Sequence, residues 1–158
     1  MPATTSIKLF LSSDEETDRL GRVMADCLGP GDTLLLFGPV GAGKSHLSRA
    51  IIRSRLGRME DVPSPTFTLV QTYEDARGDL WHADLYRLSG GSDLAELGLE
   101  DAFRSAICLV EWPDRLGQTT PENPIRVWLD HADDGRTAQI SFQGRARLAA
   151  ALKDFSNG

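Results

Sequence analysis

The chain has 158 residues, 41% of them hydrophobic and 25% charged, so we expect one domain with a buried core over residues 1–158. A net charge of −6 argues against broad binding to a nucleic-acid backbone. The sequence has neither an apolar run of 18 residues nor a signal-peptide pattern, and its two cysteines lack a C-x-x-C partner, which together favour a cytoplasmic protein with reduced thiols.

The N-terminal segment predicts a strand followed by a helix. Residues 7–11 alternate weakly between apolar and polar types, which favours a strand with an edge position in the sheet. Ser13 and Glu16 have the spacing of a capping box, which marks the start of a helix. Apolar residues then recur at helical spacing as far as Leu28, and residues 29–32 are expected to end the helix.

The phosphate-binding pattern G-x-x-x-x-G-K-[ST] is matched by residues 38–45, GPVGAGKS. An apolar run at 33–37 predicts the preceding strand, and helical spacing up to Gly57 predicts the following helix, as the motif requires. Inward-facing N–H groups would cradle phosphate oxygens, with Lys44 reaching the β- and γ-phosphates and Ser45 binding Mg²⁺. A glycine-rich turn that binds nothing is the weaker alternative, so the sequence predicts nucleoside triphosphate binding.

Four arginines follow this loop in the predicted helix and just beyond it. We favour a solvated helix face over a strip that docks RNA or an acidic partner. The four residues are Arg49, Arg53, Arg55 and Arg58.

The middle of the chain predicts strands and short helices. After a loop at 58–65, β-branched and aromatic residues predict strands at 66–73 and 80–83, joined by a hairpin turn. Short helices are expected at 92–97 and 99–103.

The C-terminal part predicts three more strands and a final helix. The fully apolar run at 107–110 is typical of a strand buried on both faces, and a loop is expected at 118–124. Strands at 125–129 and 138–142 and a helix at 146–155 complete the chain. Together these elements predict an α/β fold whose mixed parallel and antiparallel central sheet is flanked by helices.

Two acidic residues end predicted strands, where a phosphate-binding loop needs a carboxylate for Mg²⁺. Glu111 follows the strand at 107–110, and Asp84 follows the strand at 80–83. The carboxyl ends of strands line the ligand crevice of open α/β sheets, so both side chains are candidates. The alternative is that they cap turns or pair with an arginine, for which Arg87 is the candidate partner of Asp84.

For the other candidates the pattern alone favours the structural alternative at least as strongly as the functional one. Thr66 is either a switch residue near the γ-phosphate or simply the start of a strand. Trp112 either stacks on the base and gates the crevice or fills the core. His82 is expected to be a satisfied core histidine rather than a base, and together with His46 and His131 it lacks the spacing of a zinc site.

With these segments in place, the sequence resembles the TsaE (YjeE) family, small ATPases of bacterial tRNA threonylcarbamoyladenosine synthesis. The likeness covers residues 13–116 and fades after Gly117. It is carried by GAGKS at 41–45, SPTFTLV at 64–70, HADLYRL at 82–88, ELG at 96–98 and ICLVEWP at 107–113.

The resemblance implies a P-loop ATPase that turns over slowly and works with TsaD and TsaB, which transfer the threonylcarbamoyl group to an adenosine beside the anticodon. It implies contact with tRNA at most through that complex. A small phosphotransferase acting on a nucleoside or metabolite is the alternative, although only scattered arginines follow Glu111. An ATP-binding interaction module without turnover is a third possibility, and a GTPase is disfavoured because N-K-x-D is missing.

The resemblance also implies a role for each site residue. Catalysis would depend on Lys44, Thr66, Asp84 and Glu111, with Thr66 and Asp84 as switch and hydrolysis residues. Mg²⁺ would be bound by Ser45 and Glu111. The residues implied to bind ATP are Ser13, Thr17, Gly41, Ala42, Gly43, Lys44, Ser45, His46, Trp112 and Arg136.

Three positions depart from the family pattern. Ser45 stands where threonine is commoner, with an equivalent hydroxyl. Ala83 replaces an aromatic residue, and His46 stands where a small hydroxyl residue is frequent.

Overall fold

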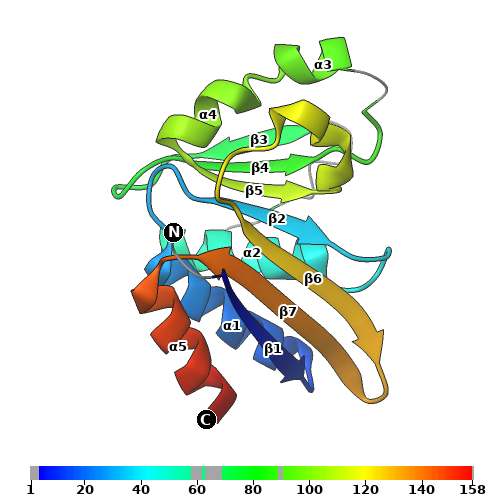
Figure 1. The fold of residues 1–158 in the computed structure, drawn as a ribbon, viewed down its shortest axis with the longest axis vertical. Helices are drawn as coiled ribbons and strands as arrows, with labels where there is room; N and C mark the ends of the chain where they lie inside the picture. Colours follow the sequence, from blue (N-terminus) through cyan, green and yellow to red (C-terminus); the bar gives the residue numbers. More distant parts are fainter. Residues whose placement is uncertain (1–3, 58–61, 63–68, 89–90, 158) are drawn as a thin grey trace.

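The structure is a computed structural model that describes residues 4–57, 62, 69–88 and 91–157. These residues form one seven-stranded sheet in the order β1-β7-β6-β2-β5-β4-β3 (Figure 1). The strands are β1 (Thr4–Leu11), β2 (Thr33–Phe37), β3 (Val70–Tyr73), β4 (Leu80–Asp84), β5 (Ile107–Glu111), β6 (Ile125–Ala132) and β7 (Gly135–Gln143).

The sheet is mixed, as predicted. Strand β2 pairs in parallel with β5 and β6, and β4 pairs in parallel with β5. The pairs β1–β7, β6–β7 and β3–β4 are antiparallel. The carboxyl ends of β2, β4 and β5 therefore lie along one edge of the sheet, next to the phosphate-binding motif.

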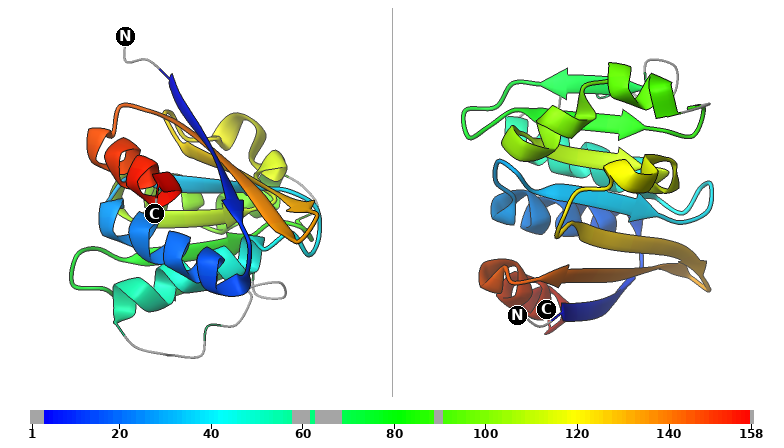
Figure 2. Two further views of the ribbon diagram at one scale, coloured as in Figure 1. Left: turned by 90° about the horizontal axis from the view of Figure 1, so that it is seen from below. Right: turned by 45° about the horizontal axis from the view of Figure 1, so that its top comes forward.

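Helices cover both faces of the sheet. Each face of the sheet has its own buried cluster. The first packs Leu20, Ile51 and Leu152 against strand side chains, and the second contains Leu99 and Leu116. In the right-hand view of Figure 2, α3, α4 and η1 lie in front of the strands, with α1 and α2 behind. The helices are α1 (Asp14–Cys27), α2 (Lys44–Leu56), α3 (Gly91–Glu96), α4 (Leu99–Ser105), α5 (Ala146–Asn157) and the 3₁₀ helix η1 (Pro113–Thr119).

Local sequence explains where α1 and α2 begin and end. Ser13 is the N-cap of α1, and its Oγ accepts a hydrogen bond from the Glu16 amide at 3.2 Å. The Glu16 carboxylate instead pairs with Arg19 at 2.8 Å, so only the serine half of the predicted capping box is seen. Helix α2 ends at Leu56 and is capped by Gly57, whose left-handed backbone lets its amide donate to the Arg53 carbonyl.

The structure corrects the expectation for one arginine of α2. Arg55 is only 5% exposed and is not part of a solvated face. Its Nε donates to Asp75 at 2.9 Å, and its Nη1 donates to the carbonyls of Ala25 and Leu28. Arg55 therefore joins the ends of α1 and α2 to the β3–β4 turn. The side chain of Arg58 lies outside the described residues.

Several boundaries differ from the prediction. Strand β1 begins at Thr4, because its pairing with β7 extends the ladder beyond the apolar residues. The described part of β3 begins at Val70, and Thr66 lies outside the described residues. The 3₁₀ helix at Pro113–Thr119 was not predicted. Both cysteines are free thiols, and none of the described helices has the length and apolar character to cross a membrane.

Candidate nucleotide-binding site

The phosphate-binding motif forms a tight connection between β2 and α2. Gly38, Gly41 and Gly43 all have positive φ values, between 81° and 140°, which side chains rarely tolerate. A Cβ atom on Gly38 would collide with the Leu129 carbonyl on β6. A Cβ on Gly43 would lie 3.0 Å from the Arg136 guanidinium. The glycines therefore let the loop pass close to the sheet and to a cation.

Lys44 is the first residue of α2 and is 5% exposed. Its Nζ donates a hydrogen bond to the Gly38 carbonyl and lies 3.4 Å from the centroid of the Trp112 ring. Burial lowers the pKa of Lys44, while the carboxylates of Glu111, Asp84 and others act in the opposite direction. The loop thus holds a desolvated ammonium group beside two carboxylates.

Ser45 and Glu111 meet across the sheet edge. The Ser45 Oγ donates a hydrogen bond of 2.7 Å to Oε1 of Glu111, which is buried at the end of β5. Hydroxyl and carboxylate oxygens are hard donors suited to Mg²⁺, which takes few protein ligands and completes its shell with water and phosphate. The described residues contain no group of three or more His, Cys, Asp and Glu placed to hold a metal.

Asp84 lies beside this pair. It is the register partner of Glu111 in the parallel β4–β5 ladder and is 6% exposed. Its Oδ1 accepts a hydrogen bond from the Tyr86 amide at 3.0 Å, which fixes the carboxylate at the strand end. Both predicted acids therefore occupy adjacent positions at the mouth of one cavity.

His82 joins the site, which the sequence did not indicate. It is fully buried, as expected of a core histidine, but its Nε2 lies 2.6 Å from Oε2 of Glu111. The available signal was its spacing from Asp84, because residues i and i+2 of a strand face the same side.

A cavity of about 440 Å³ opens over the loop. It is lined by Gly41, Gly43, Lys44, Ser45, His46, Asp84, Glu111, Trp112 and Arg136 among the predicted residues, together with Asp14, Val40, Arg49 and Tyr86. A second hollow of about 270 Å³ adjoins it and contains Ser13 and His131. The two share Asp14, Gly41 and Arg136, so they adjoin one another.

Arg136, at the start of β7, is held over the loop by residues of α1. Its Nη2 lies 3.0 Å from the Asp14 carboxylate, and its Nη1 donates to the Thr17 hydroxyl at 3.1 Å. Thr17 is buried and lines neither hollow, so it reaches the site through Arg136. Ala42 is also buried outside both linings, and His46 lies 2.8 Å from Asp18.

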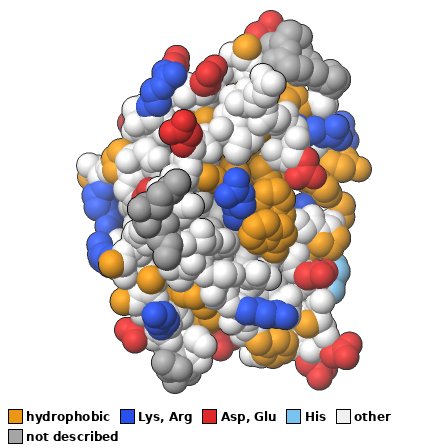
Figure 3. Space-filling view, in the orientation of Figure 1, with side chains coloured by type: hydrophobic (Ala, Val, Ile, Leu, Met, Phe, Trp, Pro, Cys, Tyr) orange, Lys and Arg blue, Asp and Glu red, His pale blue; other side chains and the backbone are white. Residues whose placement is uncertain are grey.

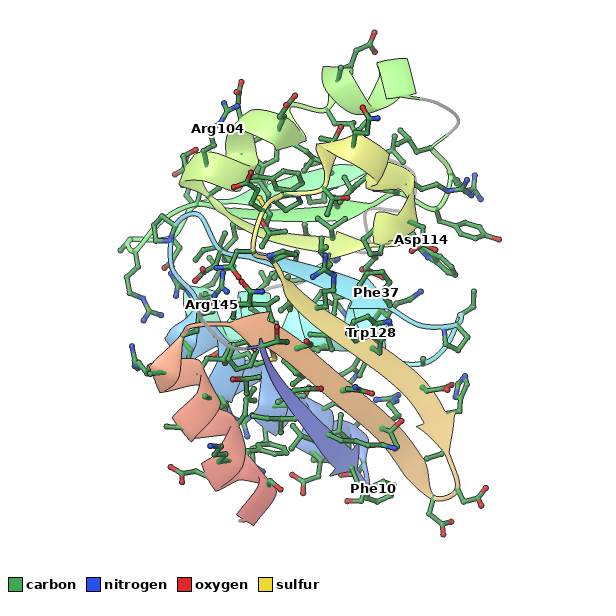
Figure 4. All side chains as sticks on the ribbon, in the orientation of Figure 1. Phe10, Phe37, Arg104, Asp114, Trp128 and Arg145 are labelled. Atoms are coloured by element: carbon green, nitrogen blue, oxygen red, sulfur yellow. The ribbon has the colours of Figure 1, made fainter. Side chains whose placement is uncertain are left out.

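Aromatic rings flank the cavity. Trp112 has φ 58° and packs against Tyr86, with ring centroids 4.9 Å apart, and it also contacts the buried cluster beneath α4. Trp112 therefore lines the cavity on one side and packs against the core on the other, so neither interpretation of this residue is excluded. Phe37 and Trp128 stack at 5.0 Å on a neighbouring patch (Figure 4), where Figure 3 shows hydrophobic side chains gathered.

Comparison with known proteins decides the family. Residues 11–139 match the family model of the threonylcarbamoyl adenosine biosynthesis protein TsaE. The chain belongs to the TsaE family. This confirms the resemblance inferred from the sequence motifs.

Curated TsaE-family relatives cover most of the chain. The tRNA threonylcarbamoyladenosine biosynthesis protein TsaE of Haemophilus influenzae is 38% identical over 144 residues, which is 87% of this chain and 90% of the relative. The protein of the same name from Rickettsia felis is 37% identical over 128 residues, 81% of this chain and 75% of the relative. The crystal structure of Bacillus subtilis YdiB matches with a TM-score of 0.74 and 26% identity, over 99% of this chain and 97% of YdiB. The α/β fold with its mixed sheet is thereby confirmed.

Proposed function

We propose that the chain binds ATP with Mg²⁺ in this cavity and hydrolyses it slowly in support of tRNA threonylcarbamoyladenosine modification, with TsaD and TsaB as partners. The observation that carries the proposal is the hydrogen bond between Ser45 and Glu111, one residue from the buried Lys44. The Ser45 hydroxyl, the Glu111 carboxylate and the Lys44 ammonium group come together at the N-terminus of α2. The N-terminus of a helix attracts phosphate. The partners are inferred from membership of the TsaE family.

The residues present fit a triphosphate and its metal. Gly41 and Gly43 adopt positive φ, and a Cβ atom at Gly43 would crowd Arg136, which lies beside the loop and is paired with Asp14. The two adjoining hollows, of about 440 and 270 Å³, extend from the acids to Ser13 and His131. This extent suits a phosphate chain at one end and a nucleoside at the other.

Each side chain has a distinct role in this proposal. Lys44 would exchange the Gly38 carbonyl for phosphate oxygens, and Mg²⁺ would be held by Ser45 and Glu111, where it would neutralise charge on the phosphates. Asp84 orients the attacking water from the next strand. Arg136 is already bound to Asp14 and Thr17, so it is not free to supply the arginine assistance worth about 10³–10⁵ in other P-loop NTPases, and we expect slow turnover by the isolated chain.

The test compares the chain alone with the assembled complex. ATP hydrolysis and formation of the modified adenosine in tRNA are measured with and without TsaD and TsaB, for wild type and Lys44→Ala. We expect slow hydrolysis alone, modification only with the complete set, and loss of both in the variant. Arg104→Ala is the control, because Arg104 is exposed on α4, where its side chain pairs with Asp101, which is exposed as well.

Two outcomes would contradict the proposal. One is modification that proceeds equally well with Lys44→Ala. The other is transfer of the γ-phosphate to a nucleoside or metabolite without partner proteins, which would establish the phosphotransferase alternative.

A further inference from the structure

We propose that His82 is a positioning residue that fixes the Glu111 carboxylate in the orientation needed to bind Mg²⁺, an inference that rests on the proposed function of the site. His82 lines neither hollow of the site and is fully buried, so it cannot touch a bound nucleotide in this arrangement. Any effect it has on the metal must pass through Glu111.

The carboxylate of Glu111 is held by a different partner at each oxygen. Ser45 Oγ donates to Oε1 at 2.7 Å from the start of α2. His82 Nε2 lies 2.6 Å from Oε2, with side-chain exposures of 0% for His82 and 3% for Glu111. Because the two contacts come from opposite ends of the group, rotation of the carboxylate breaks at least one of them.

Register explains why His82 can reach this carboxylate. His82 is paired with Leu109 in the β4–β5 ladder, two residues before the pair of Asp84 with Glu111. Alternate residues of a strand share a face, so His82, Asp84 and Glu111 project to the same side. This is the side covered by α2, because the neighbouring Leu80 and Leu109 belong to the same buried cluster as Ile51.

The contact with the Glu111 carboxylate decides which ring nitrogen carries the proton. A carboxylate only accepts hydrogen bonds, so a bare Nε2 at 2.6 Å would oppose lone pairs to lone pairs. The Nδ1 atom is buried and has no hydrogen-bond partner among the described residues. The Nδ1–H tautomer would therefore add an unsatisfied buried donor to the clash, whereas the Nε2–H form donates to Glu111.

Outer-shell partners that orient a metal ligand typically contribute about 10–100-fold to metal affinity. Since one oxygen of Glu111 is held by the contact with His82, the other stays directed at Ser45, where the predicted metal ligands meet. His82 thus keeps the two oxygen ligands together.

The first experiment uses two amide substitutions of similar size. His82→Gln places its amide nitrogen near the position of Nε2, and His82→Asn places it near Nδ1, away from Glu111. ADP affinity is measured by calorimetry with Mg²⁺ and with EDTA. We expect His82→Asn to lose about tenfold or more of the Mg²⁺-dependent gain in affinity. We expect His82→Gln to retain most of that gain, and affinity in EDTA to stay the same in both.

Leu80→Ala is the matched control, because Leu80 is buried on the same strand and face. It should lower the unfolding temperature without altering the Mg²⁺-dependent gain. Equal behaviour of His82→Gln and His82→Asn would overturn the positioning role.

The second experiment needs no variant. Long-range ¹H–¹⁵N NMR of the wild-type imidazole identifies which ring nitrogen is protonated, and we expect the proton on Nε2. A bare Nε2 in a wild type whose ADP affinity does rise with Mg²⁺ would overturn the role of His82 alone. A wild type whose ADP affinity does not respond to Mg²⁺ would instead overturn the proposed function.

Discussion

The ammonium group of Lys44 lies 3.4 Å from the centroid of the Trp112 ring, at the point where the start of α2 faces the end of β5. The same Nζ donates to the Gly38 carbonyl, so Lys44 of α2 contacts both the loop and Trp112, the residue that follows β5. Trp112 adopts φ 58°, an uncommon conformation for an aromatic residue, directly after Glu111. A change in the contacts of Lys44 is therefore expected to alter the surroundings of this indole.

Substitution of Lys44 by methionine should change how stability depends on pH. Burial lowers the pKa of Lys44, so between that pKa and the ordinary value of about 10.4 the unfolded chain binds more protons than the folded one. The free energy of unfolding then gains a contribution that rises with pH across this window. In Lys44→Met that contribution disappears.

We therefore expect the stability of wild type relative to Lys44→Met to increase as pH rises toward about 10. Urea denaturation of the nucleotide-free proteins at several alkaline pH values measures it. Lys153→Met, on the exposed face of α5, is the control and should show no such trend. A pH-independent difference between wild type and Lys44→Met would contradict the role of burial.

Glu111→Gln should remove most of the effect of Mg²⁺ on nucleotide affinity. The amide keeps the shape of the side chain but replaces a charged oxygen ligand, so we expect a loss of about tenfold or more in affinity with Mg²⁺. Affinity in EDTA should not fall. Asp114→Asn removes a nearby charge from a residue that does not line the cavity, and a Mg²⁺ titration of that variant should resemble wild type.

Asp84→Asn should separate binding from hydrolysis. If Asp84 orients the attacking water, removing its charge lowers the hydrolysis rate by about 10²-fold or more, as for other groups that assist proton transfer. Nucleotide affinity should change little, because Lys44, Ser45 and Glu111 remain. Single-turnover hydrolysis and calorimetry measure the two quantities, and an unchanged rate would exclude this role.

Gly21→Val should destabilise the contact between α1 and α2. A Cβ atom at Gly21 would lie 2.5 Å from the Cβ of Ala50, so a larger side chain must push the helices apart. We expect the free energy of unfolding to fall by about 1–3 kcal/mol. Gly29→Ala is the control, since a Cβ there meets nothing within 4 Å, and thermal unfolding of both variants measures the difference.

Much of the architecture could be predicted from local patterns. The alternating and fully apolar runs, the glycine-rich motif and the helical spacing of α1 each depend on residues close in sequence. They indicated a mixed α/β sheet and put Asp84 and Glu111 at strand ends, where the structure places them. The β1 and β3 boundaries were less accurate, because pairing partners decide where a ladder stops.

By itself, the sequence determined the strand, loop and helix of the phosphate motif, because a glycine-rich turn and its flanking periodicities are local properties. Only the tertiary structure decided that His82 contacts Glu111, that Arg136 rests on Asp14 and Thr17, and that Arg55 is buried. Each of these contacts joins residues far apart in the chain. Their geometry follows from strand order, register and helix packing, which no short segment of sequence specifies alone.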